Sequence, residues 1–181
     1  MHQHLTLRLI HEFWHGTQRV RFLQSLGGDR CNILLPDTVE AGRDVHACIS
    51  IRCDTAVGNE RLRAGKAPFV PSNGIILATR TVSFTEGETV FNVLQRETRA
   101  AGIQMEFSSN PMFNSVYIEG INNLYEFDCG ELSGWMYKVN GWFPNYGCSQ
   151  YMLQPGDVIE WVYTCDLGSD VGGGYAAGTQ G

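Results

Sequence analysis

The chain has 181 residues, of which 43% are hydrophobic and 18% are charged. This balance is typical of one folded domain with its own core, and it excludes a disordered chain and a coiled coil. The formal net charge of −6, with no basic block, argues against contact with the phosphates of nucleic acid. No apolar run approaches the roughly 20 residues of a membrane-spanning helix.

Residues 1–45 carry no sustained pattern, and no secretory signal is visible in them. They contain His11, Glu12 and His15 in the spacing His-Glu-x-x-His, which on a helix would aim two imidazoles at one zinc ion with Glu12 as the base. A catalytic zinc needs a third ligand, and four of the five histidines lie in the first fifteen residues, so we interpret the motif as a chance match. We therefore expect neither a metal site nor enzyme activity, with a zinc-dependent hydrolase as a remote alternative.

From residue 46 the sequence predicts short strands around a single helix. Apolar residues alternate over 46–53 and form a β-branched run over 75–84, which predicts two strands joined by a Gly- and Pro-rich loop over 54–74. A helix is predicted to open at 85–88 and to end at Gly102, the residue type that favours a left-handed C-terminal cap. Its apolar face consists of Val90, Phe91, Leu94, Thr98 and Ala101.

The clearest local pattern is a hairpin turn at Asn140 and Gly141. Both residues tolerate a positive φ, as a two-residue type I′ turn requires. The preceding residues alternate in character from Trp135 to Val139, and in this register Val139 faces Trp142. The sequence therefore predicts two antiparallel segments joined at this turn.

Further strands are predicted over 103–107, 115–118 and 158–165, followed by a flexible Gly-rich tail over 171–181. One helix among six or seven short strands predicts an α+β domain, with a β-grasp-like sheet packed around the helix. The predicted domain covers residues 46–170.

The six cysteines form no Cys-x-x-Cys pair, which favours disulfides and an oxidising compartment over a zinc site. Cys129 and Cys148 flank the predicted hairpin, so a bulge could join them. Cys53 and Cys165 end the first and last predicted strands, and they could pair if those strands are neighbours. The alternative is that these residues are buried free thiols, which pack as small hydrophobic side chains.

Aromatic residues are concentrated in and after the hairpin. Successive side chains of a strand point to opposite faces, so these rings cannot all face the core, and some of them are expected to be exposed. One interpretation is a core with a satellite cluster. The other is an aromatic, backbone-rich edge that covers a flat ligand or a partner surface. The residues concerned are Trp135, Tyr137, Trp142, Phe143, Tyr146 and Tyr151.

The chain from about residue 48 to residue 170 resembles a bacterial domain family of unknown function. That family is similar to the C-terminal β-domain of the vitamin B12 carriers transcobalamin and intrinsic factor. The matching segments are SIRCDT (50–55), VSFTEGETVFNVLQ (82–95), VYIEGINNLYEFDCGELSGWMYKVNGW (116–142), PNYGCSQYMLQPGDVIEW (144–161) and YTCDLGSDVG (163–172).

This resemblance implies a β-grasp-like fold and a domain that packs over one face of a corrinoid. It implies that ligand contacts come from the hairpin and from the loop over 144–149. The expected ligand-binding residues are Trp135, Tyr137, Trp142, Pro144, Asn145, Tyr146, Gly147 and Ser149. Cobalamin or a related corrinoid is the expected ligand, and no cofactor is required.

The resemblance also implies a secreted or surface-anchored protein, in agreement with the cysteine content, although the native export signal is not visible in this chain. We therefore expect a non-catalytic extracellular binding module whose partner is a small molecule or another surface protein. A structural or adhesive module of a bacterial surface protein is the alternative.

Overall fold

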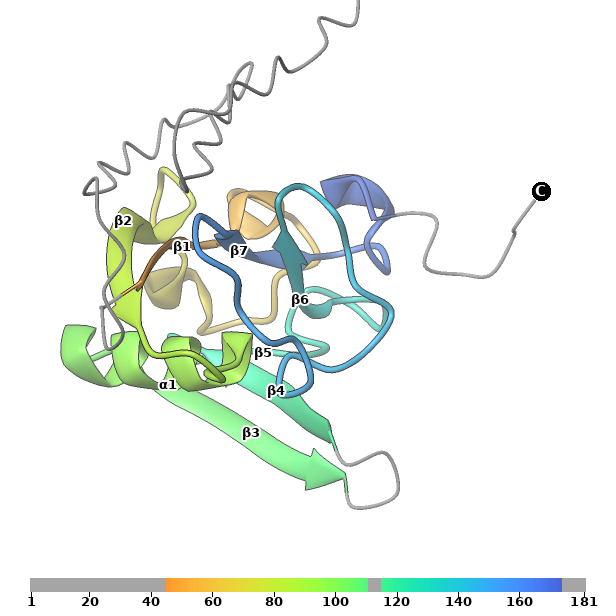
Figure 1. Ribbon diagram of the computed structural model, residues 1–181. Coiled ribbons are helices and arrows are strands. Elements are labelled where there is room, and N and C mark those ends of the chain that lie inside the picture. The colour runs from red at the N-terminus through yellow and green to blue at the C-terminus, as the bar shows by residue number, and fades with distance from the viewer. Residues whose placement is uncertain (1–44, 111–114, 174–181) are drawn as a thin grey trace, which may run out of the picture. The chain divides into compact units, whose positions relative to one another are not determined.

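The computed structural model describes residues 45–110 and 115–173, and these residues form one helix and seven strands (Figure 1). The elements in chain order are β1 (Val45–Arg52), β2 (Ile75–Phe84), α1 (Val90–Ala101), β3 (Met105–Asn110), β4 (Ser115–Ile121), β5 (Leu124–Tyr125), β6 (Gly134–Val139) and β7 (Val158–Thr164). Three short 3-10 turns cover Asp54–Ala56, Ala67–Phe69 and Ser169–Val171. The predicted α+β class is confirmed.

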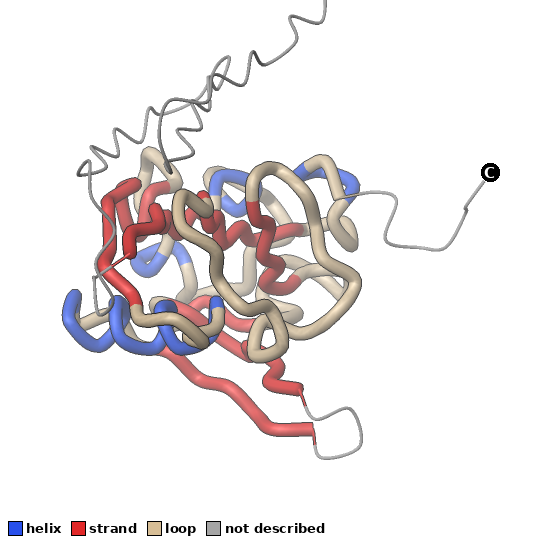
Figure 2. The backbone as a smooth tube through the Cα atoms, in the orientation of Figure 1, coloured by secondary structure: helices blue, strands red, loops and turns tan. Residues whose placement is uncertain are grey.

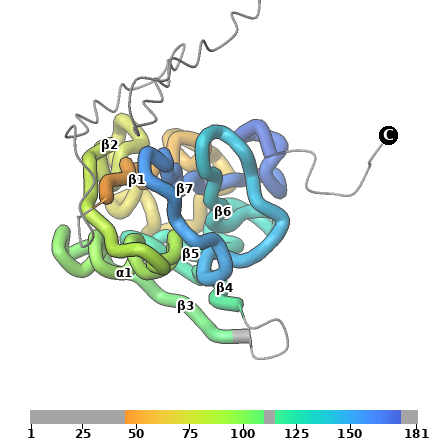
Figure 3. Tube along the Cα trace, viewed as in Figure 1, coloured from red at the N-terminus to blue at the C-terminus, as the bar shows by residue number. Residues whose placement is uncertain are grey.

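The strands form two sheets, one of four strands in the order β2-β1-β7-β6 and one of three in the order β3-β4-β5. The first and last strands of the described chain, β1 and β7, lie side by side and run parallel (Figure 3). The other strand pairs are antiparallel. Most of β1 and β7 is buried, as expected of strands at the centre of a covered sheet.

The helix is fixed at both ends by its own sequence. Thr89 caps the N-terminus: its hydroxyl accepts from the backbone N–H of Asn92, and the Asn92 side chain accepts from the N–H of Thr89. The segment predicted to open the helix, 85–88, is a turn before this cap instead. Gly102 ends the helix with a φ of 67°, as predicted.

The helix packs its apolar side against the sheets, and Figure 2 shows it beside the long β3–β4 hairpin. Val90, Val93 and Leu94 are fully buried in the common core. Phe91 meets Phe107 of β3 edge to face, with ring centroids 4.8 Å apart. This burial of apolar surface is the main stabilising contribution to the fold.

The predicted hairpin turn is confirmed, but the predicted partner segment is wrong. Asn140 and Gly141 have φ values of 54° and 79°, and Val139 exchanges two backbone hydrogen bonds with Trp142. Pairing ends at this point, and β6 pairs with β7 instead, with Trp135 opposite Tyr163. The chain after Trp142 leaves the sheet as a loop over residues 143–157.

Several expectations concern residues outside the described part of the chain. His11, Glu12 and His15 lie outside the described residues. Residues 1–44 of the predicted N-terminal segment and residues 174–181 of the predicted tail lie outside them as well. Within the described ranges, the model has no helix that is both long and apolar enough to cross a membrane.

Candidate functional site

The 143–157 loop is held against the domain by hydrogen bonds from three sides. The Tyr137 hydroxyl donates to the backbone carbonyl of Tyr146 over 2.8 Å. The Ser149 hydroxyl accepts from the backbone N–H of Val116 on β4 over 3.0 Å. At the start of α1, the N–H of Phe91 donates to the carbonyl of Cys148. The loop is therefore ordered by the surrounding strands and helix.

At Gly147 the backbone of this loop passes very close to β4. A Cβ atom at this position would lie 1.7 Å from the Ser115 hydroxyl oxygen. Only glycine allows the backbone to approach the strand so closely. The sequence of the loop thus determines how tightly it closes on β4.

A pocket of about 180 Å³ lies between the loop, β4, β6 and Trp161 of β7. Its lining is mainly apolar and aromatic. The residues are Val116, Tyr117 and Ile118 of β4, Trp135, Met136 and Tyr137 of β6, Pro144, Gly147 and Cys148 of the loop, and Trp161. A concave apolar surface with a few polar groups is the usual form of a small-molecule site.

Polar groups of the lining residues are already paired, with one exception. The Tyr117 hydroxyl donates to Glu126 over 2.6 Å, and the Cys148 thiol donates to the carbonyl of Val116. Trp161 is 2% exposed, and its indole N–H has no hydrogen-bond partner in the described part of the chain. Buried donors are nearly always paired, so this N–H requires an explanation.

Three aromatic rings form a cluster that we call the outer aromatic cluster, made of Trp142 at the hairpin turn and of Tyr146 and the half-buried Tyr151 on the loop. The Trp142 and Tyr146 rings meet edge to face, and Tyr146 stacks on Tyr151, each pair with centroids 6.2 Å apart. Trp142 is 53% exposed and Tyr146 is 40% exposed. Exposed rings held by neighbouring rings are typical of contact surfaces.

The structure divides the eight predicted binding residues into three groups. Trp135, Tyr137, Pro144 and Gly147 line the pocket. Trp142 and Tyr146 belong to the outer aromatic cluster, and Asn145 is an exposed loop residue. Ser149 supports the loop through its bond to β4. The buried pair Trp135 and Tyr137 is held in place by bonds to the carbonyls of Leu124 and Tyr146.

Six other lining residues were not predicted; Met136 and Cys148 are neighbours of predicted residues, and the other four come from strands distant in sequence. Val116, Tyr117 and Ile118 lie on β4, and Trp161 lies on β7. The alternation over 158–165 indicated that Trp161 shares a face with Ile159 and Tyr163. Nothing local in the sequence indicates that β7 lies beside β6.

The predicted disulfides Cys129–Cys148 and Cys53–Cys165 are not formed. All four residues are buried free thiols, which is the alternative that the sequence left open, whereas Cys48 is disulfide-bonded. Cys148 lies against β4, where its thiol donates to the carbonyl of Val116, and the Cys165 thiol contacts Thr55 instead. The register of β1 and β7 places Cys165 two residues beyond the position opposite Cys53. Continued strands would separate their Cα atoms by about 8 Å, which is too far for a bridge.

Burial also determines the protonation of these thiols. It raises the pKa of Cys53, Cys129 and Cys148 to about 12. It raises the pKa of the Tyr137 hydroxyl as well. The pocket therefore presents a protonated thiol and a neutral phenol at ordinary pH.

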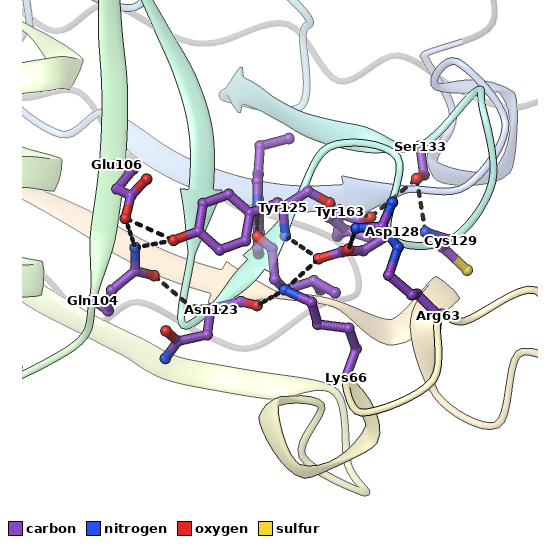
Figure 4. Close-up of polar contacts among 12 residues, drawn as sticks. Arg63, Lys66, Gln104, Glu106, Asn123, Tyr125, Asp128, Cys129, Ser133 and Tyr163 are labelled. Atoms are coloured by element: carbon purple, nitrogen blue, oxygen red, sulfur yellow. Dashed lines mark hydrogen bonds and ion pairs between the residues drawn. The ribbon is translucent and has the colours of Figure 1, made fainter.

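A second polar cluster surrounds the fully buried carboxylate of Asp128, shown in Figure 4. Lys66 lies 2.9 Å and Arg63 lies 3.3 Å from its two oxygens, and the backbone N–H of Tyr125 donates to it. The Lys66 ammonium also lies 4.6 Å from the centre of the Tyr125 ring. Protein groups compensate the buried charge from several sides, so this cluster joins the 53–74 loop to the 122–128 segment.

Comparison with known protein families finds a match to part of this domain. Residues 87–165 match the model of a family described as Domain of unknown function (DUF4430). This match confirms the resemblance to a domain of unknown function that the sequence indicated. No curated protein matches the chain in sequence.

The solved structures that are similar to this chain include the following two. One is haptocorrin in complex with Cbi, with 16% identity and a TM-score of 0.48 over 72% of this chain. The chain spans 27% of the length of that haptocorrin. The other is a protein from Ruminococcus gnavus ATCC 29149, with 14% identity and a TM-score of 0.42, covering 67% of this chain and 97% of that one.

Proposed function

We propose that the domain is a non-catalytic binding module that holds a flat ligand of the corrinoid type against the 143–157 loop. The observation that carries the proposal is the position of two exposed rings, Trp142 directly before the loop and Tyr146 on it, beside the loop residues Pro144, Gly147 and Cys148 that line a pocket. Flat apolar ligands gain affinity from such aromatic surfaces, and backbone groups of the loop supply orientation.

The size of the pocket determines how such a ligand would lie. A cavity of about 150 Å³ accommodates a single benzene ring, and the pocket here measures about 180 Å³. A macrocycle is too large to enter it. The ring system would therefore lie over the outer aromatic cluster, and the pocket would receive at most one substituent.

The chemistry of the pocket supports binding over catalysis. Cysteine attacks substrates as the thiolate, and burial raises the pKa of the Cys148 thiol to about 12. This thiol is therefore protonated near neutral pH. The hydroxyl of Tyr137 is likewise neutral and is committed to the Tyr146 carbonyl.

We further propose an extracellular or cell-surface location. The support is the disulfide at Cys48, because disulfides persist in oxidising compartments, together with the resemblance of the sequence to secreted carriers. Analysis of native protein for its compartment and for oxidation of Cys48 tests this part of the proposal.

Titration with cobalamin and with corrinoid precursors, followed by calorimetry and by visible absorbance, tests the ligand. We expect heat release and a spectral change that are lost in Trp142→Ala and Tyr146→Ala. Leu132→Ala is the matched control, because Leu132 is 42% exposed and lies outside the pocket lining and the outer aromatic cluster. No heat and no spectral change at high micromolar ligand would contradict the proposal.

A second candidate is a structural or adhesive module of a surface protein. The exposure of Met152 beside Tyr151 favours it, because the apolar surface then extends beyond what one ligand would cover. A surface protein whose capture requires Trp142 and Tyr146, with no response to corrinoids, would select this candidate over the first.

A further inference from the structure

We propose that Cys129 and Cys165 form a disulfide in the oxidised protein, and that this bond fastens the two ends of the segment that carries the candidate site. Both thiols are free in the structure. The inference rests on the proposed extracellular location, because an oxidising compartment favours disulfides. It assigns a modification site to two of the four thiols and leaves Cys53 and Cys148 reduced.

The first step is the register of β6 and β7. These strands are antiparallel, and Gly134 lies opposite Thr164, so the next position places Ser133 opposite Cys165. The two segments remain joined by a backbone hydrogen bond beyond this point. Directly opposite residues of antiparallel strands have Cβ atoms about 4.5–5.5 Å apart. The side chain of Cys165 therefore lies beside that of Ser133.

The second step places Cys129 at the same serine. The backbone N–H of Cys129 donates to the Ser133 hydroxyl over 3.0 Å (Figure 4). The Tyr163 hydroxyl lies 3.0 Å from the same Ser133 oxygen. Tyr163 and Cys165 are two positions apart along the chain, so their side chains share one face of the sheet. Both cysteines thus reach Ser133 on its buried side.

The electrostatics of the two thiols agree with this placement. After burial, the Cys165 thiol is the group that most raises the pKa of Cys129. Both residues belong to the same hydrophobic core, with exposed fractions of 0% and 1%. The Cys165 thiol contacts the carbonyl and the hydroxyl of Thr55 at 3.5 Å. A thiol is a weak donor, so these contacts would not hold it away from a covalent partner.

The other pairings of the four thiols do not suit a disulfide, which needs Cβ atoms about 3.5–4.5 Å apart. The Cys148 thiol lies against β4 and donates to the carbonyl of Val116. Cys53 falls two positions short of Cys165 along the paired strands β1 and β7. Cys129 is therefore the partner that the fold brings to Cys165.

The bond would form by exchange with an external disulfide, such as glutathione disulfide. One cysteine thiolate attacks it and displaces a glutathione thiol, and the second thiolate then attacks the mixed disulfide and displaces the other glutathione. The two cysteines lose two electrons and two protons, and the two glutathione thiols carry them away. Burial raises the pKa of Cys129 to about 12, so exchange takes place before this part of the chain closes.

The bond would close the chain around the candidate site. The enclosed segment contains β6, the turn at Asn140 and Gly141, the 143–157 loop and β7. A cross-link stabilises a fold mainly because it removes conformations from the unfolded chain. Reduction of this bond should raise the equilibrium constant for unfolding by roughly 100-fold.

Peptide mapping is the direct test. The full chain is refolded from the reduced, unfolded state in a mixture of glutathione and glutathione disulfide, and its remaining thiols are alkylated. Digestion with trypsin and Glu-C places the four cysteines on different peptides. We expect one linked pair, Cys129 with Cys165, and alkylated Cys53 and Cys148. Alkylated Cys129 and Cys165, or a different partner for either, would overturn the inference.

Substitution tests the fastening role. Cys165→Ser should abolish the linked pair, so reduction should destabilise the wild type roughly 100-fold more than this variant. Cys148→Ser is the matched control: it also removes a buried thiol, and it should respond to reduction as the wild type does. Urea unfolding with and without reductant measures these responses. An equal response in the wild type and Cys165→Ser would contradict the role, and the peptide map of the wild type decides if the variant does not fold.

The inference and the proposed location fail in different ways. If the refolded chain links Cys129 to Cys165 but the native protein lies in a reducing compartment, the location is wrong and the pairing holds. If the native protein is secreted with Cys48 oxidised and with free thiols at Cys129 and Cys165, the location holds and the inference is wrong.

Discussion

Two long loops of this domain are fixed in different ways. The 53–74 loop is attached by charge, because Lys66 and Arg63 reach the buried carboxylate of Asp128. The 143–157 loop is attached by neutral contacts, namely the Tyr137 bond to Tyr146, the Ser149 bond to β4 and the close approach at Gly147. The first loop uses its polar groups internally, whereas the second leaves aromatic rings exposed beside a pocket.

This difference separates a structural contact from a binding surface. A buried ion pair leaves little chemistry for a partner, since each charge is compensated within the protein. Neutral hydrogen bonds to the backbone hold a loop in place and leave its aromatic rings free to contact other molecules. The comparison therefore separates a loop fixed by charge, to which we assign stability, from a loop fixed by neutral contacts, for which we propose ligand contact.

The largest expected effect comes from breaking the charged attachment. Asp128→Ala should reduce the free energy of unfolding by about 3–5 kcal/mol, since it removes one partner of a buried ion pair and leaves Lys66 without its counter-charge. Urea unfolding measures this loss. The outer aromatic cluster should still form in any folded fraction, because its contacts do not involve Asp128.

Arg63→Ala is the control for this prediction. The Arg63 side chain is 65% exposed, so its pair with Asp128 should contribute less than about 1 kcal/mol. Equal losses in the Asp128 and Arg63 variants would show that burial does not determine the strength of this attachment.

A smaller effect is expected from the neutral attachment. Gly147→Ala would place a Cβ atom 1.7 Å from the Ser115 hydroxyl, so the loop must move away from β4. The expected loss is about 1–3 kcal/mol, as for overpacking elsewhere, together with weaker ligand binding. Thermal unfolding and titration measure the two consequences.

A second substitution, which removes the atoms that clash with the added methyl group, tests whether the clash causes the loss of stability. Ser115→Gly in the Gly147→Ala background removes both atoms nearest to the added methyl group, and the next contact is at 3.6 Å. The double variant should recover most of the lost stability, with a coupling energy on the order of 1 kcal/mol. If the double variant does not recover stability, the clash with Ser115 is not the reason why Gly147→Ala is destabilising.

Local chemistry predicted much of the fold, while long-range pairing did not follow from the sequence. The turn at Asn140 and Gly141 and the helix end at Gly102 depend on backbone preferences that single residues express. The departure of the chain after Trp142 depends on β7 taking the place beside β6, a contact between distant segments. The two-residue strand β5 was missed, because it is too short for a pattern.

The candidate site, too, could be predicted from the sequence only where it depends on local segments. Its loop residues were predicted from the resemblance, and its exposed rings from their density along the sequence. The pocket requires β4 and Trp161 to face β6, which only the folded chain brings together. The predicted disulfides were wrong because of long-range arrangement as well: the loop carries Cys148 against β4, and the register of β1 and β7 places Cys165 beyond the position opposite Cys53.

The two loops are expected to respond alike to alkaline pH. Cys53 begins one loop and Cys148 lies in the other, and burial raises the pKa of both thiols from 9.0 to about 12. The unfolded chain therefore ionises first, so stability is fully present below pH 9 and is lost as the pH rises toward 12. From pH 8 to about pH 9.5, ionisation of each thiol in the unfolded chain should lower the free energy of unfolding by on the order of 1 kcal/mol.

Unfolding at these two pH values, with Cys148→Ser as the comparison, measures the contribution of one thiol. The variant should lose on the order of 1 kcal/mol less stability than the wild type over this interval. Thiol alkylation at pH 8 gives an independent readout, since both residues should react only after unfolding. Rapid labelling of the native protein would contradict their burial.

The smallest effect on stability is expected at the outer aromatic cluster, where Trp142→Ala and Tyr146→Ala should each cost about 0.5–1 kcal/mol for the lost ring contact. Trp135→Phe is the contrasting variant, because it removes a buried hydrogen bond to Leu124 and should cost about 1–3 kcal/mol. Urea unfolding of the three variants, beside ligand titration, tests whether stability and binding separate. If the exposed rings prove as important for folding as Trp135, then both loops serve the core, and the contrast between a structural and a binding loop is wrong.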